Sequence, residues 1–367
     1  MCVRTGDAKD CQLLGAASLK FHAPAGTVAV PNAGGAGYYR FDLPAADWQT
    51  LITALPALPA GEALSVDDSL WASFRAGRAP AASLVAEARA ILGNPDSNAS
   101  LIAGERFAGL RLRGLIEGPA LADYSRMMDG LYGPKLAALG LDPAVGAYAS
   151  EDPDRQKLRQ ELVALVVSEA RDPAAGAKLV AAAKAYLAGD AKALDQGYMG
   201  AAFAAHLKAG GLPAAKALLD KALSSEDAVF RSTALGAVGG SGLPEVGTWV
   251  LGLEDSRLRP LERLGLVGSM AATAETKDMA GAWILANYDR LAGGGNGIFV
   301  TARLTSALRY QCSVDRAVQI DKVLGPKVRA ANKSVLDFER TLETIRHCGD
   351  LKAARESELA TALKAAS

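Results

Sequence analysis

The chain of 367 residues is poor in residue types that often carry enzyme chemistry. It has three histidines, four cysteines and only 6% aromatic residues. His22, His206 and His347 lie too far apart to form the H-E-x-x-H helix that binds zinc in metallopeptidases. No Cys-x-x-Cys pair occurs either, so the sequence contains no recognisable zinc site.

Clustered charge and long apolar runs are also missing. The 40 basic side chains balance 40 acidic ones and are interleaved with them, whereas nucleic-acid binding calls for a clustered positive field. The longest apolar run, "LVALVV" at 162–167, is far shorter than the roughly 20 residues that span a bilayer. The first ten residues carry charges where a secretory signal would be apolar. We therefore predict a soluble chain with neither nucleic acid nor membrane as a partner, in a compartment that the sequence leaves open.

The four cysteines suggest two pairs. Cys2 and Cys11 flank a Gly/Asp-rich turn between two strand-like runs, where a cross-strand disulfide is geometrically possible but not required. Cys312 and Cys348 lie in separate predicted helices and could pair only if those helices are neighbours. For the second pair we favour buried free thiols.

The chain does contain a clear change of pattern near residue 42. Four short runs rich in β-branched or aromatic residues precede it, separated by turn residues: "MCVRT", "CQLLGAASLKF", "GTVAVP" and "GYYRF". From Pro44 onward, alanine and leucine recur at helical spacing to the end of the chain. We predict β-strands over residues 1–42 and an α-helical domain over residues 43–367.

The helical part repeats one local pattern, in which an Asp-Pro or Leu-Pro start leads into an apolar stripe and a glycine stop. Ser65, with Asp68 three residues later, predicts another helix start. About 16 helices pair into units of about 40 residues, the length of HEAT-like hairpins. The predicted fold is mostly α: a HEAT-like α-solenoid of paired antiparallel helices, curved around a concave wall and preceded by a short β segment.

Three segments approach known motifs without completing them. Gly35 and Gly37 begin a G-x-G-x-x-G, but Arg40 occupies the third glycine position. "GGGNG" at 293–297 lacks its third glycine as well, and "GGSGL" at 239–243 ends in leucine where a G-x-S-x-G elbow needs glycine. We interpret the segment with Gly35 and Gly37 as a joint, residues 293–297 as a mobile connection and residues 239–243 as a helix-stopping loop. No catalytic residue is predicted.

The joint "PNAGGAGYYRFDL" resembles the junction in zinc aminopeptidases of the aminopeptidase N type, where a β-sandwich domain runs into a C-terminal helical domain. The residues that match are Asn32, Gly37, Tyr38, Tyr39, Arg40 and Asp42. Downstream, "FRSTALGAVGGSGLPEVGTWVLGLEDSRLRPLE" and "AGAWILANYDRLAG" resemble successive helices of that domain. "LDFERTLETIRHCGDLKAARESELATAL" is similar to its closing helix pair, so the resemblance covers nearly the whole chain.

The resemblance implies that residues 1–42 end a β-sandwich and that residues 43–367 close over a separate catalytic domain. The chain would be the non-catalytic C-terminal fragment of a zinc metallo-aminopeptidase, enclosing the active-site chamber and contacting the distal part of peptide substrates. Zinc and the catalytic motifs would belong to the missing N-terminal catalytic domain, so no catalytic or metal-binding residue is assigned here. Arg303 and Arg309, in a late helix, are candidates to hold a peptide carboxylate.

The helical array alone supports a competing hypothesis, a self-contained α-solenoid scaffold that binds a protein partner on its concave face. A complete scaffold would begin with a polar capping repeat rather than with strands, which favours the fragment. The expected partners are then the N-terminal catalytic domain of the same protein and peptide substrates. Exposed strand edges in residues 1–42 also predict that two copies could pair there.

Overall fold

The computed structural model describes residues 1–367 except 16–17, 25, 293–296 and 333, and the side chains of 297–299 are not described. The glycine-rich segment predicted to be a mobile connection therefore lies outside the described residues, apart from the backbone of Gly297.

At the N-terminus a three-stranded antiparallel sheet has the order β2-β1-β3. Its strands are β1 (Cys2–Thr5), β2 (Ala8–Cys11) and β3 (Ala29–Val30).

Two predicted strands are wrong. Residues 12–15 and 18–24 form no strand beyond the end of β2, and residues 37–41 run irregularly towards the first helix. The cause in the second case is local. The side-chain amide of Asn32 accepts from the Gly37 N–H at 2.9 Å and donates to the Gly37 carbonyl at 3.0 Å. Both main-chain groups of Gly37 are thus engaged by a side chain and cannot join a ladder.

Fifteen α-helices follow in the described part of the chain, so the fold is mostly α with a short β segment before it, as predicted. They are α1 (Ala45–Ala54), α2 (Ala60–Arg75), α3 (Ala81–Ile91), α4 (Ser97–Arg113), α5 (Ala120–Leu139), α6 (Pro153–Leu165), α7 (Pro173–Leu187), α8 (Met199–Leu223), α9 (Ala228–Gly239), α10 (Pro244–Leu251), α11 (Pro260–Ala271), α12 (Lys277–Ala292), α13 (Gly297–Ala307), α14 (Val314–Ala331) and α15 (Val335–Ala366). Short helical turns η1 to η5 lie between them, and two of these matter below: η3 (Val166–Ala170) and η5 (Leu308–Tyr310).

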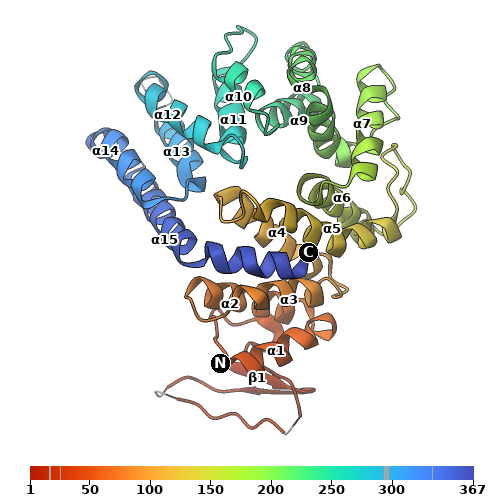
Figure 1. The fold of residues 1–367 in the computed structure, drawn as a ribbon, viewed down its shortest axis with the longest axis vertical. Helices are drawn as coiled ribbons and strands as arrows, with labels where there is room; N and C mark the ends of the chain where they lie inside the picture. The colour runs from red at the N-terminus through yellow and green to blue at the C-terminus, as the bar shows by residue number, and fades with distance from the viewer. Residues whose placement is uncertain (16–17, 25, 293–296, 333) are drawn as a thin grey trace.

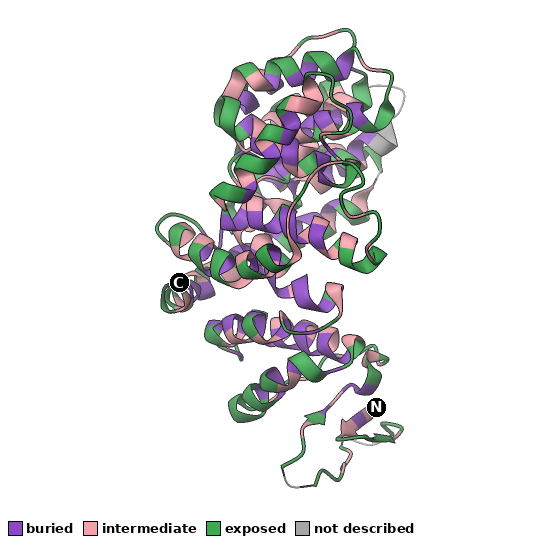
Figure 2. Cartoon of the chain, turned by 90° about the vertical axis from the view of Figure 1, so that its right-hand side faces the viewer, coloured by how far each residue is buried: buried purple, intermediate pink, exposed green. Residues whose placement is uncertain are grey.

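The helices from α4 to α14 follow an arc, in which consecutive elements pack on one another (Figure 1). Aspartate caps start several of them: Asp152 and Asp172 accept hydrogen bonds from first-turn amides of α6 and α7, each followed by proline at the first helical position. These two predicted starts are confirmed. Each helix along the arc carries buried residues beside exposed ones (Figure 2), because no helix pair can cover its apolar stripe alone.

Two details of the predicted helices are wrong. α2 begins at Ala60 after Pro59 rather than at Ser65, whose hydroxyl instead accepts a hydrogen bond from the Asn32 amide at 2.9 Å. The predicted closing helix pair is a single helix of 32 residues, α15. Gly349 does not end it, because this glycine serves a close contact: a Cβ there would lie 2.7 Å from the Val314 nitrogen.

The last helix closes the arc. α15 packs against α13 and α14 at one end and against α3 and α5 at the other, and it crosses the molecule in Figure 1. None of the described helices is both long enough and apolar enough to cross a membrane.

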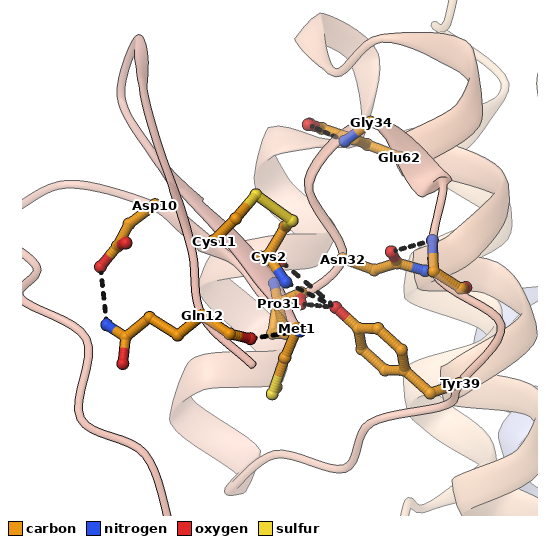
Figure 3. Close-up of a disulfide and its surroundings, with 11 residues drawn as sticks. Met1, Cys2, Asp10, Cys11, Gln12, Pro31, Asn32, Gly34, Tyr39 and Glu62 are labelled. Carbon is orange, nitrogen blue, oxygen red and sulfur yellow. Dashed lines mark hydrogen bonds between the residues drawn. A yellow bond between two sulfur atoms is a disulfide. The ribbon is translucent and has the colours of Figure 1, made fainter. Parts of the chain in front are cut away.

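Both cysteine pairs form disulfides, Cys2–Cys11 and Cys312–Cys348. The first joins the ends of the β1–β2 hairpin, where Cys2 and Cys11 are direct cross-strand partners (Figure 3). The expectation of free thiols at Cys312 and Cys348 is wrong. Cys312 lies between η5 and α14 rather than within a helix, and the absence of a side chain at Gly349 lets that segment approach α15 until the two Cα atoms are 4.9 Å apart.

Candidate functional site

The joint at residues 31–43 is held by side chains that bond to the backbone. Besides the Asn32–Gly37 pair, the Tyr39 hydroxyl donates to the Pro31 carbonyl at 2.6 Å and accepts from the Cys2 amide at 3.4 Å (Figure 3). Arg40 forms an ion pair with Asp68 of α2 at 2.7 Å. Of the residues that carried the family resemblance, Tyr38 alone has its side chain fully exposed.

Glu62 of α2 fixes the other side of the joint. Its carboxylate accepts from the Gly34 amide at 2.8 Å and forms a two-pronged ion pair with Arg4 of β1 at 2.5–2.9 Å. Burial alone would raise the pKa of Glu62, but these hydrogen bonds and the Arg4 charge lower it below its ordinary value. With the Gly34 and Gly37 amides already bonded, the glycines have no free cradle for a phosphate.

A large hollow in the described part of the molecule lies elsewhere, on the arc of helices. This cavity of about 1060 Å³ is lined by α4, α6, η3, α7 and α8 and by the loops 240–243 and 272–275. Its lining residues run from Leu101 to Glu275, so successive elements of the arc contribute to a single cavity. A concavity built in this way is the natural binding surface of a helical solenoid.

A partly buried polar network forms one wall of the cavity. Arg111 of α4 contacts the Glu169 carboxylate of η3 at 3.3 Å and also forms an ion pair with Glu275, in the loop before α12. The Tyr124 hydroxyl of α5 donates to Glu169 at 2.9 Å. Burial raises the pKa of Tyr124 well above its ordinary value, and the Glu169 charge raises it further, so this phenol stays a hydrogen-bond donor. The network ties four parts of the arc together: α4, α5, η3 and the loop before α12.

An irregular backbone places Glu169 in that network. η3 is a π-helical turn that continues α6, and the residue directly after it is Arg171, a non-glycine residue with φ of 62°. Such turns bulge out of the regular helix and are frequent at functional sites. Here the bulge directs Glu169 towards Arg111 and leaves Arg171 at the cavity surface, 3.9 Å from Glu275.

Lys208 of α8 supplies a cation with no bonded partner. Its ammonium makes neither a hydrogen bond nor an ion pair with any described residue, although it lines the cavity. Burial lowers the pKa of Lys208, and the positive charge of Arg111 lowers it further. The Lys208 side chain is exposed to solvent at the cavity surface, and an incoming carboxylate would favour its charged form.

The described residues contain no group of three or more histidine, cysteine, aspartate or glutamate side chains placed to hold a metal ion. All four cysteines are in disulfides. Zinc, which the family resemblance implies for the parent enzyme, therefore finds no matching set of ligands in this part of the chain.

The structure brings together the two arginines suggested from the sequence. Arg303 of α13 and Arg309 of η5 line the same groove, of about 400 Å³, which α15 completes on its other side. Both side chains are exposed there. The large cavity was missed from the sequence, because Arg111, Glu169 and Glu275 are far apart along the chain and no spacing rule connects them. The only local signal was a polar "SEARD" directly after the apolar "LVALVV".

Comparison with protein families gives one match: the family model described as "ERAP1-like C-terminal domain" matches residues 28–347. No curated protein matches the chain. The matched range begins just before β3 and reaches into α15, so it includes the joint, the cavity and nearly all of the helical array.

Proposed function

Because the chain belongs to the family of ERAP1-like C-terminal domains, in keeping with its resemblance to the helical domain of aminopeptidase N type enzymes, we propose that it encloses the active-site chamber of a zinc aminopeptidase. In this role it contacts the distal part of the peptide substrate and breaks no bond itself. The observation that supports the proposal most directly is the cavity of about 1060 Å³, whose lining comes from successive elements of the arc.

The chemistry of the cavity suits a positioning role. Arg111 contacts both Glu169 and Glu275, and Arg171 lies 3.9 Å from Glu275, so two cations balance two carboxylates and that wall is preorganised rather than reactive. Lys208 keeps an unsatisfied positive charge that can hold a carboxylate of a bound peptide. A domain that covers the reacting end and holds the distal end would exclude water and restrict the motion of the substrate. Zinc would be bound by the catalytic domain, which would also be this chain's main partner.

The proposal is tested by supplying the catalytic domain of the same protein in trans. We expect the chain alone to contain no zinc by elemental analysis and to leave an alanine anilide uncleaved, and the mixture to hydrolyse it. Zinc and turnover in the isolated chain would falsify the proposal. Mixing without any effect, together with tight binding of an unrelated protein, would instead favour the scaffold.

A variant separates positioning from general stability. Lys208→Ala should raise KM several-fold for a peptide of about ten residues in the reconstituted enzyme, while KM for the single-residue anilide stays unchanged. Lys322→Ala is the matched control, because Lys322 is an exposed lysine of α14 that makes no ion pair with a described residue. Equal effects on the two substrates would argue against a distal contact at Lys208.

We also propose that two copies of this chain can associate through the N-terminal sheet. β2 and β3 are both edge strands, and all four residues of β2 are exposed. An exposed strand edge carries unpaired main-chain groups that readily accept another strand. Sedimentation should show a dimer that dissociates on dilution; a monomer at every concentration would contradict the idea.

A further inference from the structure

A second concentration of positive charge lies away from the large cavity. The groove between α13, η5 and α15 presents three guanidinium groups and one carboxylate, contributed by Arg303, Arg309, Arg340 and Asp337. The arginines come from two segments of the chain, α13–η5 and α15, that meet only in the folded protein.

The three guanidinium groups lack acidic partners. No carboxylate of a described residue lies within 4.0 Å of Arg303, Arg309 or Arg340, and the one side-chain hydrogen bond among them is from Arg309 to the Tyr310 hydroxyl, at 2.7 Å. Other arginines that join elements are paired: Arg4 with Glu62 and Arg231 with Glu262. In the groove, by contrast, three arginines gather without an acidic partner among the described residues.

The positive charge extends beyond the groove through Tyr310. The guanidinium carbons of Arg309 and Arg113 lie 4.8 Å and 6.0 Å from the centre of the same Tyr310 ring. Arg113, at the end of α4, is half-buried and donates only one long hydrogen bond, 3.4 Å to the Gly109 carbonyl. Burial lowers the pKa of Arg113, and the charges of Arg75 and Arg309 lower it further. Arg113 is therefore a fourth cation beside Tyr310, outside the lining of the groove, and no carboxylate of a described residue lies within 4.0 Å of it.

Charge balance indicates what would fill the groove. Three guanidinium groups against the single carboxylate of Asp337 leave two positive charges uncompensated. Like charges gathered in one groove repel one another, and an anion of matching charge removes that repulsion. The hydroxyls of Ser306, Thr341 and Thr344 donate to carbonyls of their own helices, so the donors for a ligand are the guanidinium forks. Such forks match the oxygen spacing of phosphate.

We propose that the groove formed by Arg303, Arg309 and Arg340 binds a doubly charged oxyanion of the phosphate class. A single carboxylate, such as the end of a peptide, would leave one positive charge uncompensated in the groove. The phosphoryl group could belong to free phosphate or to a phosphate monoester, since both present the same three oxygens. This site is separate from the large cavity and does not depend on the proposed peptidase role.

The test is calorimetric titration of the intact chain at constant ionic strength and about pH 8, where phosphate is a dianion. Inorganic phosphate should bind at one site per chain, with acetate at least about tenfold weaker. Arg309→Gln and Arg340→Gln should each weaken phosphate binding by about tenfold, the usual effect of losing one charge-assisted contact. Arg263→Gln is the matched control, because Arg263 lies on α11, outside the groove, and makes no ion pair with a described residue.

The other outcomes are equally informative. Absence of phosphate binding, or binding that both groove variants retain at full strength, would overturn the proposal. Acetate or a peptide with a free carboxyl end binding as tightly as phosphate would assign the groove to carboxylates instead. Glycerol 3-phosphate distinguishes the two sources: tighter binding than phosphate indicates a monoester, and weaker binding indicates the free ion. Circular dichroism and the thermal midpoint of each variant show that folding is intact.

Discussion

Glu87 is an acid buried in the core without a bonded partner. It lies on α3 with 3% of its surface exposed, and its Oε1 atom makes no hydrogen bond with a described residue. Arg106, the cation that acts on it, is already bonded to Asp67 at 2.8 and 3.0 Å. Two buried carboxyl groups thus share one positive charge. Burial, and then the Asp67 charge, raises the pKa of Glu87 well above its ordinary value.

Glu87→Gln should therefore change how stability depends on pH. A folded-state pKa above the unfolded value means that the folded protein keeps a proton that the unfolded chain releases, so this group lowers stability as pH rises above the unfolded pKa, near 4.5. Glutamine does not titrate, so the variant does not lose this part of its stability as the pH rises. The free energy of unfolding of the variant, relative to the wild type, should rise between about pH 5 and about pH 8 in urea titrations. Parallel curves for the two proteins would show that Glu87 is ionised in the fold.

Gly35 in the joint has both a special backbone angle and no space for a side chain. Its φ is 64°, and a Cβ would lie 2.1 Å from the Gly61 carbonyl oxygen at the start of α2. Gly35→Ala should destabilise the fold by more than the roughly 1–2 kcal/mol that a left-handed backbone costs an alanine. Gly6→Ala is the control. Gly6 has φ of 58°, but a Cβ there would have no atom within 4 Å, so this substitution should cost only the smaller amount. Equal losses in urea unfolding would mean that the joint is loose enough to move apart.

At the scale of the helices, two kinds of contact fix where an element begins and what it touches. Aspartate caps such as Asp172, which accepts from the Ala175 amide at 2.6 Å, set the starts. Disulfides and close backbone contacts determine which helices lie side by side. The Cys312–Cys348 bridge, beside Gly349, holds the start of α14 against α15. It spans 36 residues, against 9 for Cys2–Cys11.

Removing the Cys312–Cys348 bridge should therefore lower the free energy of unfolding more than removing the Cys2–Cys11 bridge does. The double change Cys312→Ser and Cys348→Ser should lower the free energy of unfolding by about 3–4 kcal/mol, because the unfolded chain regains the freedom of the larger loop. The matching change at Cys2 and Cys11 should cost about 2–3 kcal/mol and act mainly on the N-terminal hairpin. The measurement is urea unfolding, repeated with and without reductant. A wild-type curve that reductant does not shift would contradict the role of both bridges.

At the scale of the whole molecule, α15 makes the arc a closed body. Near its C-terminal end, Arg355 donates to the Ala79 carbonyl at 2.6 Å, and the Glu358 carboxylate accepts from the Ala81 amide at 2.7 Å. Ala81 is the first residue of α3, so Glu358 bonds to a free amide of that helix from 277 positions away. This hydrogen bond is one of the contacts that join the two ends of the helical array, together with the packing of α15 on α3 and α5.

Glu358→Ala should weaken that closure by about 1–2 kcal/mol, the cost of leaving a helix-start amide without its acceptor. Hydrogen exchange should quicken in the first turn of α3 and the last turns of α15, while the cavity helices keep their protection. Glu358→Gln retains an acceptor oxygen and should restore most of the loss. Glu356→Ala, also on α15 but paired only with Lys352 at 3.8 Å, should have little effect. If it has the same effect as Glu358→Ala, the closure depends on α15 as a whole.

The sequence by itself determined the elements and their class. Helical spacing of alanine and leucine, Asp-Pro starts and the change of pattern near residue 42 are local signals, and the mostly α fold follows from them. The family resemblance was readable for the same reason, because it rests on short continuous segments: the joint and three helical stretches that follow it. Local signals also explain the errors: Ser65 and the run at 37–41 matched a helix start and a strand, and a contact with Asn32 engages each of them instead.

Only the tertiary structure decided which distant residues meet. Arg111 lies 58 residues from Glu169 and 164 from Glu275, and Arg309 shares a groove with Arg340 because α15 turns back along α13. The cavity, the groove, the Cys312–Cys348 bridge and the closure by α15 all depend on how the helices stack. Stacking is set by the shapes of whole buried faces, whereas spacing along the chain specifies only which face of each helix is apolar.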